Sequence, residues 1–346
     1  MKYLIKKYGV FYVLTVFMSL SMASTSVYAG QAKKLYPGTI TIGMETWTGY
    51  FPLIVARDKG FFKEAGLDVV IKRYVSLGEL SKDYVAGKMQ ARATLTLEAV
   101  QESIKGMDHK VVLAVDYSDG SDAIVATQNI QNVKDFRGKK VGFEPGTLEE
   151  FFLSWALVEN EMSLSDITPV FSNPEETAKK LKNGEIDVAI SHEPFLSQFL
   201  ASKDFHIVYS SKDTPGLITD IVTFRTDFIE AHPETVEAVV RAYFKGLVFW
   251  KEHPGEVNVM IAKEFQDSPE SIGRQIEGIK MLSEEDNVTA FTFAAGLRSL
   301  YGNLRQIGKF VLKHGVKGAN SLDTDKLIDR QFIKKISERE RERVDL

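Results

Sequence analysis

The fold is decided by the stretch TITIGMETWTGYFPLIVARDKGFF, residues 39–62. Ile40, Ile42 and Met44 alternate with Thr and Gly, which predicts a strand, whereas the apolar residues after position 52 recur at helical spacing. The period changes at 47–50, where a Trp, a Gly and a Tyr lie together. A strand that leads into a helix places free backbone N–H groups at the edge of a sheet, where open α/β folds hold ligands. This turn is therefore a candidate ligand site, although its aromatic residues are equally consistent with capping a core.

The N-terminal residues have the composition of a secretory signal peptide. Three Lys among the first seven residues precede a largely apolar stretch at 10–22, and the residues ending at Ala29 fit the small-x-small cleavage pattern. We predict a signal peptide over residues 1–29, because the apolar stretch is too short for a membrane anchor. The sequence contains no Cys, which excludes a lipid anchor on Cys and any disulfide. An unanchored exported protein stays with its cell only behind an outer membrane, so we expect it in the periplasm of a Gram-negative bacterium.

Charge and length narrow the class of protein further. Cleavage after Ala29 removes three of the 43 basic residues and none of the 47 acidic ones, so the formal net charge changes from −4 to −7. This balance argues against a nucleic acid or an anionic membrane surface as partner. No later stretch has the length of a membrane span, and the remaining 317 residues suffice for about two domains.

Strand-like and helix-like stretches alternate between residues 39 and 224, which predicts an α/β fold with parallel sheets and crossover helices. After Arg225 the pattern is mainly helical, with helices expected from Pro233, from Ser268-Pro269 and over 295–312. The charged residues 338–345 suit a solvated helix end or an unstructured tail. Two extended stretches, 123–127 and 221–224, flank the central block as two strands crossing between lobes would, and this layout implies a hinge.

Several segments, in their order and spacing, resemble the nitrate/sulfonate/taurine-type solute-binding proteins of ABC importers. These segments are WTGYFP at 47–52 with ARDKGFF at 56–62, GLDV at 66–69, DYSDGSDA at 116–123, FRGKKVG at 136–142, GEIDVA at 184–189 with HEPF at 192–195, and DTPGLI at 213–218. No single segment is decisive, but together they cover nearly the whole exported chain.

The resemblance implies the type II periplasmic-binding fold, an α/β fold with two lobes. Each lobe is then a mixed, mostly parallel sheet flanked by helices, and two hinge strands join the lobes. Lobe 1 would comprise residues 30–124 and 224–346, and lobe 2 residues 125–223. Such a protein, which we expect to be a monomer, closes around a small molecule and docks on an ABC permease in the inner membrane. It needs no cofactor and performs no covalent chemistry.

The strand-to-helix turns that would face the cleft supply the candidate ligand residues, which are Trp47, Tyr50, Thr96, Glu98, Asp119, Asp122, Glu144, Gly146, Thr147, Glu193 and Asp220. Six of them are acids, whereas few Lys or Arg fall at such turns. Burying acids without cations or donors costs several kcal/mol, so we expect a ligand with an amine or a nitrogen heterocycle. Trp47 and Tyr50 would add cation–π or stacking contacts.

Two alternatives stay open at this site. Each acid taken alone also suits a turn, a cap or the first turn of a helix. A helix N-terminus after Gly146 is moreover a ready anion site, as expected for a sulfonate, taurine or nitrate ligand. Against an anion, Thr147-Leu148-Glu149-Glu150 spells a capping box that would satisfy the free N–H groups itself.

The sequence does not indicate an enzyme or a metal site. It lacks a Cys nucleophile, a His-Glu-x-x-His helix, a Gly-x-Ser-x-Gly elbow and a Gly-rich phosphate loop, and its six His are dispersed. His192 beside Glu193 is better explained as a cleft or structural residue than as a ligand or an acid–base group. A protein that senses the same kind of ligand and signals to a membrane receptor would share this sequence pattern.

Overall fold

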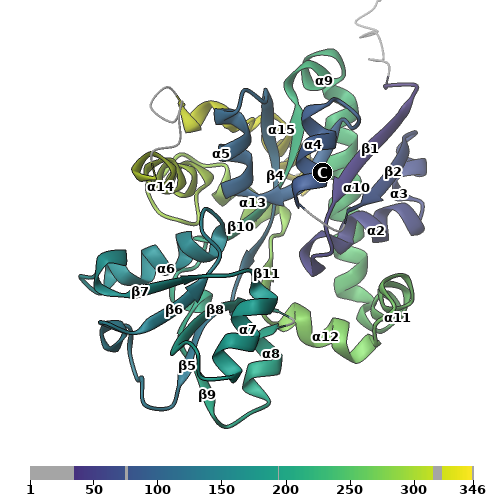
Figure 1. The fold of residues 1–346 in the computed structure, drawn as a ribbon. Coiled ribbons are helices and arrows are strands. Elements are labelled where there is room, and N and C mark those ends of the chain that lie inside the picture. The colour runs from purple at the N-terminus through teal and green to yellow at the C-terminus, as the bar shows by residue number, and fades with distance from the viewer. Residues whose placement is uncertain (1–34, 75–76, 194, 315–321, 345–346) are drawn as a thin grey trace, which may run out of the picture. The chain divides into compact units, whose positions relative to one another are not determined.

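The computed structural model describes residues 35–74, 77–193, 195–314 and 322–344. The predicted signal peptide over residues 1–29 lies outside these ranges. Within them, no helix combines the length and the apolar character needed to cross a membrane. Residues from Tyr36 onward form one unit, which contains two sheets (Figure 1).

The first sheet has the strand order β11-β4-β10-β3-β1-β2. Its strands are β1 (Thr39–Met44), β2 (Asp68–Arg73), β3 (Ala91–Leu95), β4 (His109–Ser118), β10 (Thr219–Arg225) and β11 (Ile279–Met281). The predicted strand at residues 39–44 is confirmed, and its Ile40, Ile42 and Met44 are fully buried. Strand β1 runs parallel to β2 and β3, whereas β10 enters antiparallel between β3 and β4.

The second sheet has the order β7-β6-β8-β5-β9. Its strands are β5 (Asp122–Thr127), β6 (Lys140–Phe143), β7 (Thr168–Phe171), β8 (Val188–His192) and β9 (Phe205–Ser210). Strand β6 pairs parallel with β7 and β8, whereas β5 is antiparallel to both of its neighbours. The α/β class with mixed sheets is confirmed, but parallel pairing is less dominant than expected because β5 and β10 enter their sheets antiparallel.

Helices cover both sheets (Figure 1). Those that contact the first sheet or a helix packed on it include α2 (Phe51–Asp58), α3 (Phe61–Glu64), α4 (Leu77–Val85), α5 (Thr96–Ile104), α9 (Thr226–Ala231) and α10 (Pro233–Glu252). Helices α6 (Leu148–Glu159), α7 (Pro174–Lys182) and α8 (Phe195–Leu200) contact the second. The chain continues through α11 (Pro254–Phe265), α12 (Pro269–Glu277), α13 (Glu284–Ala290), α14 (Leu300–Lys313) and α15 (Gln331–Val344). Short 3₁₀ turns are η1 (Thr48–Tyr50), η2 (Val133–Phe136), η3 (Leu164–Asp166), η4 (Ser211–Asp213) and η6 (Thr324–Leu327).

One predicted helix begins later than expected. Helical spacing predicted a start at Ala295, but α14 begins at Leu300 after an extended Ser299. The reason is a close approach within the chain, because a Cβ on Gly302 would overlap the carbonyl of Gly296. The residues before Ser299 therefore fold back against the first turn of α14 instead of extending it.

The chain passes from the first sheet to the second between β4 and β5, and returns between β9 and β10. The two passages touch each other, since Ser118 Oγ lies 2.8 Å from Ser211 Oγ and the Gly120 amide donates to the same oxygen at 2.7 Å. The amides of Asp119 and Ser121 both donate to the Gly278 carbonyl, just before β11. The two passages are thus hydrogen-bonded side by side. They lie at 119–121 and 211–218, whereas the two stretches predicted to cross, 123–127 and 221–224, lie within β5 and β10.

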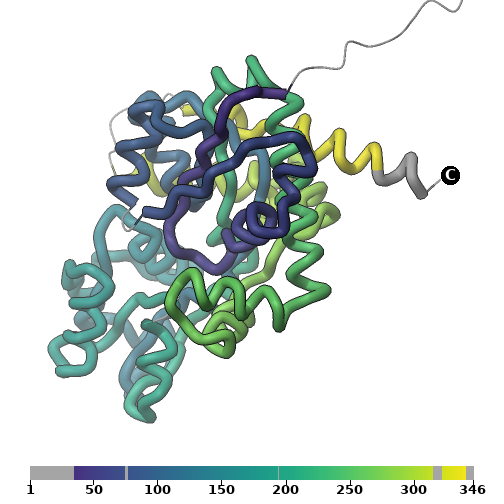
Figure 2. The backbone as a smooth tube through the Cα atoms, turned by 90° about the vertical axis from the view of Figure 1, so that its right-hand side faces the viewer, coloured from purple at the N-terminus to yellow at the C-terminus, as the bar shows by residue number. Residues whose placement is uncertain are grey.

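A glycine fixes the packing of α10 on α2, two helices far apart in the sequence that lie side by side (Figure 2). The predicted apolar face of α10 is buried, and within it Gly246 lies against the Pro52 carbonyl so closely that a Cβ would overlap this oxygen. Only a residue without a side chain permits this approach.

We expect Gly246→Ala to lower the free energy of unfolding by about 1–3 kcal/mol, because the two helices must move apart to admit a methyl group. Gly255→Ala on α11 is the matched control, since nothing lies within 4 Å of the added Cβ. Urea unfolding followed by circular dichroism measures both variants. Equal stability of the two would contradict this account of the helix contact.

Candidate functional site

The aromatic turn after β1 closes over two buried aspartates of the first sheet. Trp47 Nε1 donates to Asp116 Oδ2 at 3.2 Å, and the Tyr50 hydroxyl donates to Asp220 Oδ1. Gly49 between them lies directly against the Asp116 carboxylate, where a Cβ would overlap Oδ2. The turn therefore positions two ring donors on two acids, which is a more specific arrangement than the core cap that the sequence left open.

Asp116 on β4 and Asp220 on β10 are register partners in the sheet. Their exposed fractions are 0% and 2%. Burial raises the pKa of both carboxyl groups. The negative charge of Asp116 raises the pKa of Asp220 further. Asp116 Oδ1 is closed to solvent and has no hydrogen-bond donor among the described residues.

The second sheet brings further acids to this pair. Asp122, the first residue of β5, is buried, and its charge contributes to the raised pKa values of Asp116, Asp220 and Glu149. Burial raises the pKa of Glu149, near the start of α6, to about 8. Glu149 Oε2 accepts from the Glu144 amide at 2.7 Å, while Oε1 lacks a donor in the described part of the chain.

Two glutamates extend the group of acids on the first sheet. Burial raises the pKa of Glu98, in the first turn of α5, and of Glu45, just after β1, to about 7 in each case. The fully buried Arg92 on β3 opposes both shifts, but its guanidinium is held by Glu102 at 2.6 Å and by Thr94 at 2.6 Å. Burial raises the pKa of Glu102 as well, but this acid is paired with Arg92. We call the other six acids with raised pKa values the acid cluster; they are Glu45, Glu98, Asp116, Asp122, Glu149 and Asp220.

The structure brings five of the predicted residues into this region, namely Trp47, Tyr50, Glu98, Asp122 and Asp220. Thr96 is buried in the first turn of α5, two residues before Glu98. Asp119 is exposed and does not join the cluster, because it lies in the turn between β4 and β5 with its side chain directed to another pocket. The Glu193 carboxylate is engaged by the Ser197 amide at 3.2 Å and hydroxyl at 2.8 Å, which caps the start of α8.

The turn at Glu144, Gly146 and Thr147 differs from the predicted capping box. Thr147 does cap α6, but its Oγ1 accepts from the Glu149 amide at 3.3 Å. Glu150 reaches back to the Gly146 amide at 2.6 Å and not to the amide of Thr147. The box is thus displaced by one residue at each partner, because Glu149 is drawn to the Glu144 amide. Two backbone N–H groups of this turn already donate to carboxylates. The argument from the sequence against an anion at this turn therefore still applies.

This turn also joins the two sheets. Gln101 Nε2 of α5 donates to the Gly146 carbonyl at 2.9 Å, and Glu150 Oε1 lies 2.7 Å from His314 Nε2 of α14. The rings of Phe151 and Phe310 meet edge to face, 5.0 Å between centroids. Helix α6 of the second sheet is therefore held against α5 and α14 beside the acid cluster.

Sequence reasoning missed three members of the site, namely Glu45, Asp116 and Glu149. Asp116 offered a usable signal, because it is the single acid within the apolar strand VVLAVDY at 111–117. A buried strand tolerates such a group only with a partner or a purpose. Glu149 was assigned only to the helix end, since its burial depends on contacts that sequence spacing does not reveal.

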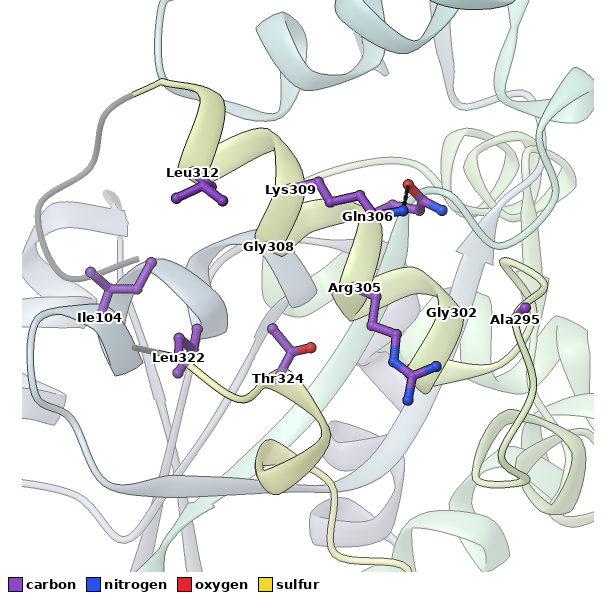
Figure 3. Close-up of a pocket in the computed structure, with 10 residues that line it drawn as sticks. All are labelled: Ile104, Ala295, Gly302, Arg305, Gln306, Gly308, Lys309, Leu312, Leu322 and Thr324. Atoms are coloured by element: carbon purple, nitrogen blue, oxygen red, sulfur yellow. Dashed lines mark hydrogen bonds between the residues drawn. The ribbon is translucent and has the colours of Figure 1, made fainter. Parts of the chain in front are cut away.

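Two hollows lie elsewhere on the protein. One of about 460 Å³ lies between α5, α14 and η6, and none of the predicted site residues lines it (Figure 3). Its Arg305 is held by Asp325 through hydrogen bonds of 3.0 and 2.5 Å. The other, about 380 Å³, lies beside the crossing between the sheets and is lined by Asp119, Lys280, Asp286 and Arg298 among others. Neither has the unpartnered buried groups that distinguish the acid cluster.

Two α/β sheets linked by two crossings, with polar groups gathered at strand ends, define the class of periplasmic-binding-protein folds. The chain belongs to the NMT1/THI5-like family, whose model matches residues 47–257. It is 25% identical over 256 residues to a Bacillus subtilis (strain 168) protein named as an aliphatic sulfonates-binding protein, covering 72% of this chain and 76% of that one.

Solved structures confirm the fold. The periplasmic aliphatic sulphonate binding protein SsuA from Escherichia coli superposes with a TM-score of 0.68 at 14% identity, covering 81% of this chain and 89% of that one. The periplasmic nitrate-binding protein NrtA from Synechocystis PCC 6803 gives 0.64 at 15% identity, covering 87% and 88%. The resemblance stated from the sequence segments is therefore confirmed.

The acid cluster predicts an unusual pH dependence of stability. A carboxyl group whose pKa is raised by folding stays protonated longer in the folded state than in the unfolded chain, so its contribution is complete at low pH and is lost as pH rises through the folded value. With a pKa of 4.5 in the unfolded chain, and folded values of about 7 for Glu45 and Glu98 and about 8 for Glu149, this loss falls between about pH 4.5 and pH 8. We expect the unfolding free energy of the ligand-free protein to fall over this range, by about 1.4 kcal/mol per pH unit for each proton retained. Urea unfolding at half-unit pH steps measures it, and a flat or rising profile would contradict the assignment.

Gly49 offers a direct test of the turn. Gly49→Ala should displace either the Asp116 carboxylate or the Trp47–Tyr50 turn, because the new methyl group and Oδ2 cannot share the same space. We expect a loss of about 1–3 kcal/mol in stability and weaker binding of any ligand that stabilises the wild type. Gly78→Ala on α4 is the control, since its Cβ meets nothing within 4 Å. If both variants bind and unfold like the wild type, the turn does not shape the site.

Proposed function

We propose that this protein is the solute-binding component of an ABC importer, exported to the periplasm by a cleaved signal peptide. It captures a small organic molecule between two lobes, closes by hinge motion and delivers it to a permease. The acid cluster carries this proposal, because it unites buried polar groups from both sheets at the strand ends where such folds bind ligands. The family assignment and the printed names of the relatives support it.

The connectivity of the sheets supports a division into two lobes. We assign residues 30–124 and 224–346 to lobe 1 and residues 125–223 to lobe 2, with the hinge at the two crossings. The hydrogen bonds of Ser118, Ser211 and Gly278 hold the two crossings side by side. This supports the placement, because a hinge needs only a few residues that change conformation. We expect the protein to act as a monomer and to use no cofactor, metal or catalytic residue.

We propose a ligand that carries an amine or a nitrogen heterocycle. Three acids of the cluster have a carboxylate oxygen closed to solvent and without a donor in the described chain, namely Glu98, Asp116 and Glu149. A buried oxygen of this kind costs about 1–3 kcal/mol until a donor reaches it. Nitrogen-bound hydrogens supply such donors, and the ring of Trp47 offers a face for stacking. The full list of ligand residues proposed from the sequence is retained for this test, with Glu45, Asp116 and Glu149 added.

The second candidate is an anionic ligand such as a sulfonate, taurine or nitrate. The names of the Bacillus subtilis and Escherichia coli proteins favour it, since both refer to sulfonates, as does the nitrate-binding neighbour. Carboxyl groups with raised pKa values are partly protonated near neutral pH and can then donate to an anion. The occupied amides of the turn at Glu144 and Gly146 argue against it.

Thermal unfolding with a ligand panel separates the candidates, because a ligand that binds only the folded state raises the melting temperature. The panel comprises amines, pyrimidines, taurine, alkanesulfonates and nitrate, each at a concentration range from micromolar to millimolar. We expect amines or pyrimidines to raise the melting temperature of the wild type, and Trp47→Ala to reduce this shift. Calorimetric titration then gives the affinity. Tight sulfonate binding without response to any amine would reject the preferred ligand and support the second candidate.

Import and signalling require the same closing cleft, so the ligand panel does not separate them. A membrane preparation that contains the cognate permease and ATPase does separate them. Stimulation of ATP hydrolysis by the ligand-loaded protein is expected for an importer. Stimulation of a sensor kinase instead would assign the protein to signalling.

A further inference from the structure

Asp116 and Asp220 lie side by side on neighbouring antiparallel strands in a region that water does not reach. Two ionised carboxylates so placed repel each other, and burial removes the solvent that would screen them. The pair is therefore tolerated only if a proton or an external cation offsets one of the two charges.

The hydrogen bonds around the pair leave one carboxylate oxygen without a donor, and a single proton can fill this gap. Asp116 Oδ2 accepts from Trp47 Nε1, and Asp220 Oδ1 accepts from the Tyr50 hydroxyl. Asp116 Oδ1 has no donor among the described residues. A protonated Asp220 would bring a donor to this carboxylate, because the two residues are register partners on β4 and β10. One shared proton thus satisfies the atom that is otherwise orphaned.

The titratable groups that face the pair come from four further elements. They are Tyr50 of η1, Glu98 of α5, Asp122 of β5 and Tyr243 of α10. All four are acids or phenols, so none brings a positive charge. Beyond them, His192 faces Asp122 across the β5–β8 pair, and Arg92 is bonded to Glu102 and Thr94.

We propose that Asp116 and Asp220 share one proton in the ligand-free protein, and that a positively charged nitrogen of the ligand displaces this proton when it binds. One proton passes to the solvent for each cation captured, and the carboxylate pair with its bound cation keeps the net charge that it had with the proton. This inference rests on the proposed function, because it concerns the same site, and it specifies the charge of the ligand.

The geometry explains how a cation replaces the proton between the two carboxyl groups. Its N–H groups reach the free Oδ1 of Asp116 and the carboxylate of Asp220, while Trp47 and Tyr50 continue to donate to the outer oxygens. A neutral molecule of the same shape leaves the proton in place. The pair therefore selects for charge as well as for size, and affinity for a cation rises as pH rises, approaching tenfold per pH unit while one proton is exchanged.

The shared proton is tested on the protein alone. Infrared spectroscopy at pH 7 detects the C=O band of a protonated carboxyl group, which disappears on ionisation. We expect the wild type to show this band, and Asp116→Asn and Asp220→Asn each to lose about one protonated carboxyl group. Asp204→Asn, at an exposed position in the turn before β9, is the matched control and should keep the band. Wild-type intensity in both pair variants would overturn the shared proton.

The displacement is tested with benzamidine, a flat cation, and with benzamide, its neutral counterpart. Calorimetric titration in phosphate and in Tris measures the protons released, because these buffers differ in ionisation enthalpy. We expect about one proton released for each benzamidine bound, and none for benzamide. This readout uses the wild type, so it stands even if an Asn variant fails to fold.

Three results would overturn the displacement. They are benzamidine binding without proton release, equal proton release with benzamide, and no benzamidine binding at millimolar concentration. If the infrared band is present in that last case, the pair holds a proton that no cation replaces, and the role in solute import still stands on the ligand panel. If no member of the panel binds, the proposed function fails, whereas the infrared result still decides the shared proton.

Discussion

The constraint on which the structure depends is the burial of carboxyl groups where strand ends of two sheets meet. The six acids of the cluster, five on different helices and strands and Glu45 just after β1, have raised pKa values because burial limits their contact with water. Each such group costs several kcal/mol if it is charged and unpaired. Three things can offset this cost: protonation of the acids, hydrogen bonds donated by Trp47 and Tyr50, and a bound solute. The aromatic turn after β1 supplies the ring donors, which explains why a Trp, a Gly and a Tyr lie at the first change of period in the chain.

The contacts between the sheets and the state of the acids depend on each other. Gln101, Glu150 and the ring pair of Phe151 and Phe310 hold α6 against α5 and α14. Asp122 faces Asp116 and Asp220 of the first sheet, and Glu149 of α6 faces Asp122. Any motion about the two crossings that parts the sheets returns these groups to water, where they ionise at ordinary values. Under the proposed function, sheets that meet without a solute therefore require protonated acids, whereas sheets that meet around a cation do not.

Sequence patterns were sufficient for the fold because hydrophobic period and turn residues act locally. They placed β1, the alternation through β10 and the apolar face of α10, but they set the two crossings a few residues too late, inside β5 and β10. They failed where the chain meets itself at close range. The approach of Gly302 to Gly296 delays the start of α14, and the attraction of Glu149 to the Glu144 amide displaces the capping box. At the site, acids at strand ends were predictable from position, and Asp116 offered a signal as the single acid of an apolar strand. Glu45 and Glu149 were not predictable, because their burial depends on contacts that sequence spacing does not reveal. Asp119 shows the converse, since a turn residue next to a buried strand can still face solvent.

The charge of the solute depends on which hydrogen-bond donors and acceptors at the site are free. The N-terminus of α6 gives the most direct evidence on this point. In a fold whose relatives carry names that refer to sulfonates and nitrate, the first turn of a helix at the cleft is the natural place for an anion. Here the amides of Glu144 and Gly146 are taken by Glu149 and Glu150, and Glu150 is held in turn by His314. An anion would have to displace two carboxylates of its own sign and leave them buried. A cation meets no such competition, because the free oxygens of Glu98, Asp116 and Glu149 are already acceptors without donors. Under the proposed function, the same fold serves ligands of opposite charge, and the identity of a few side chains at the strand ends decides between them.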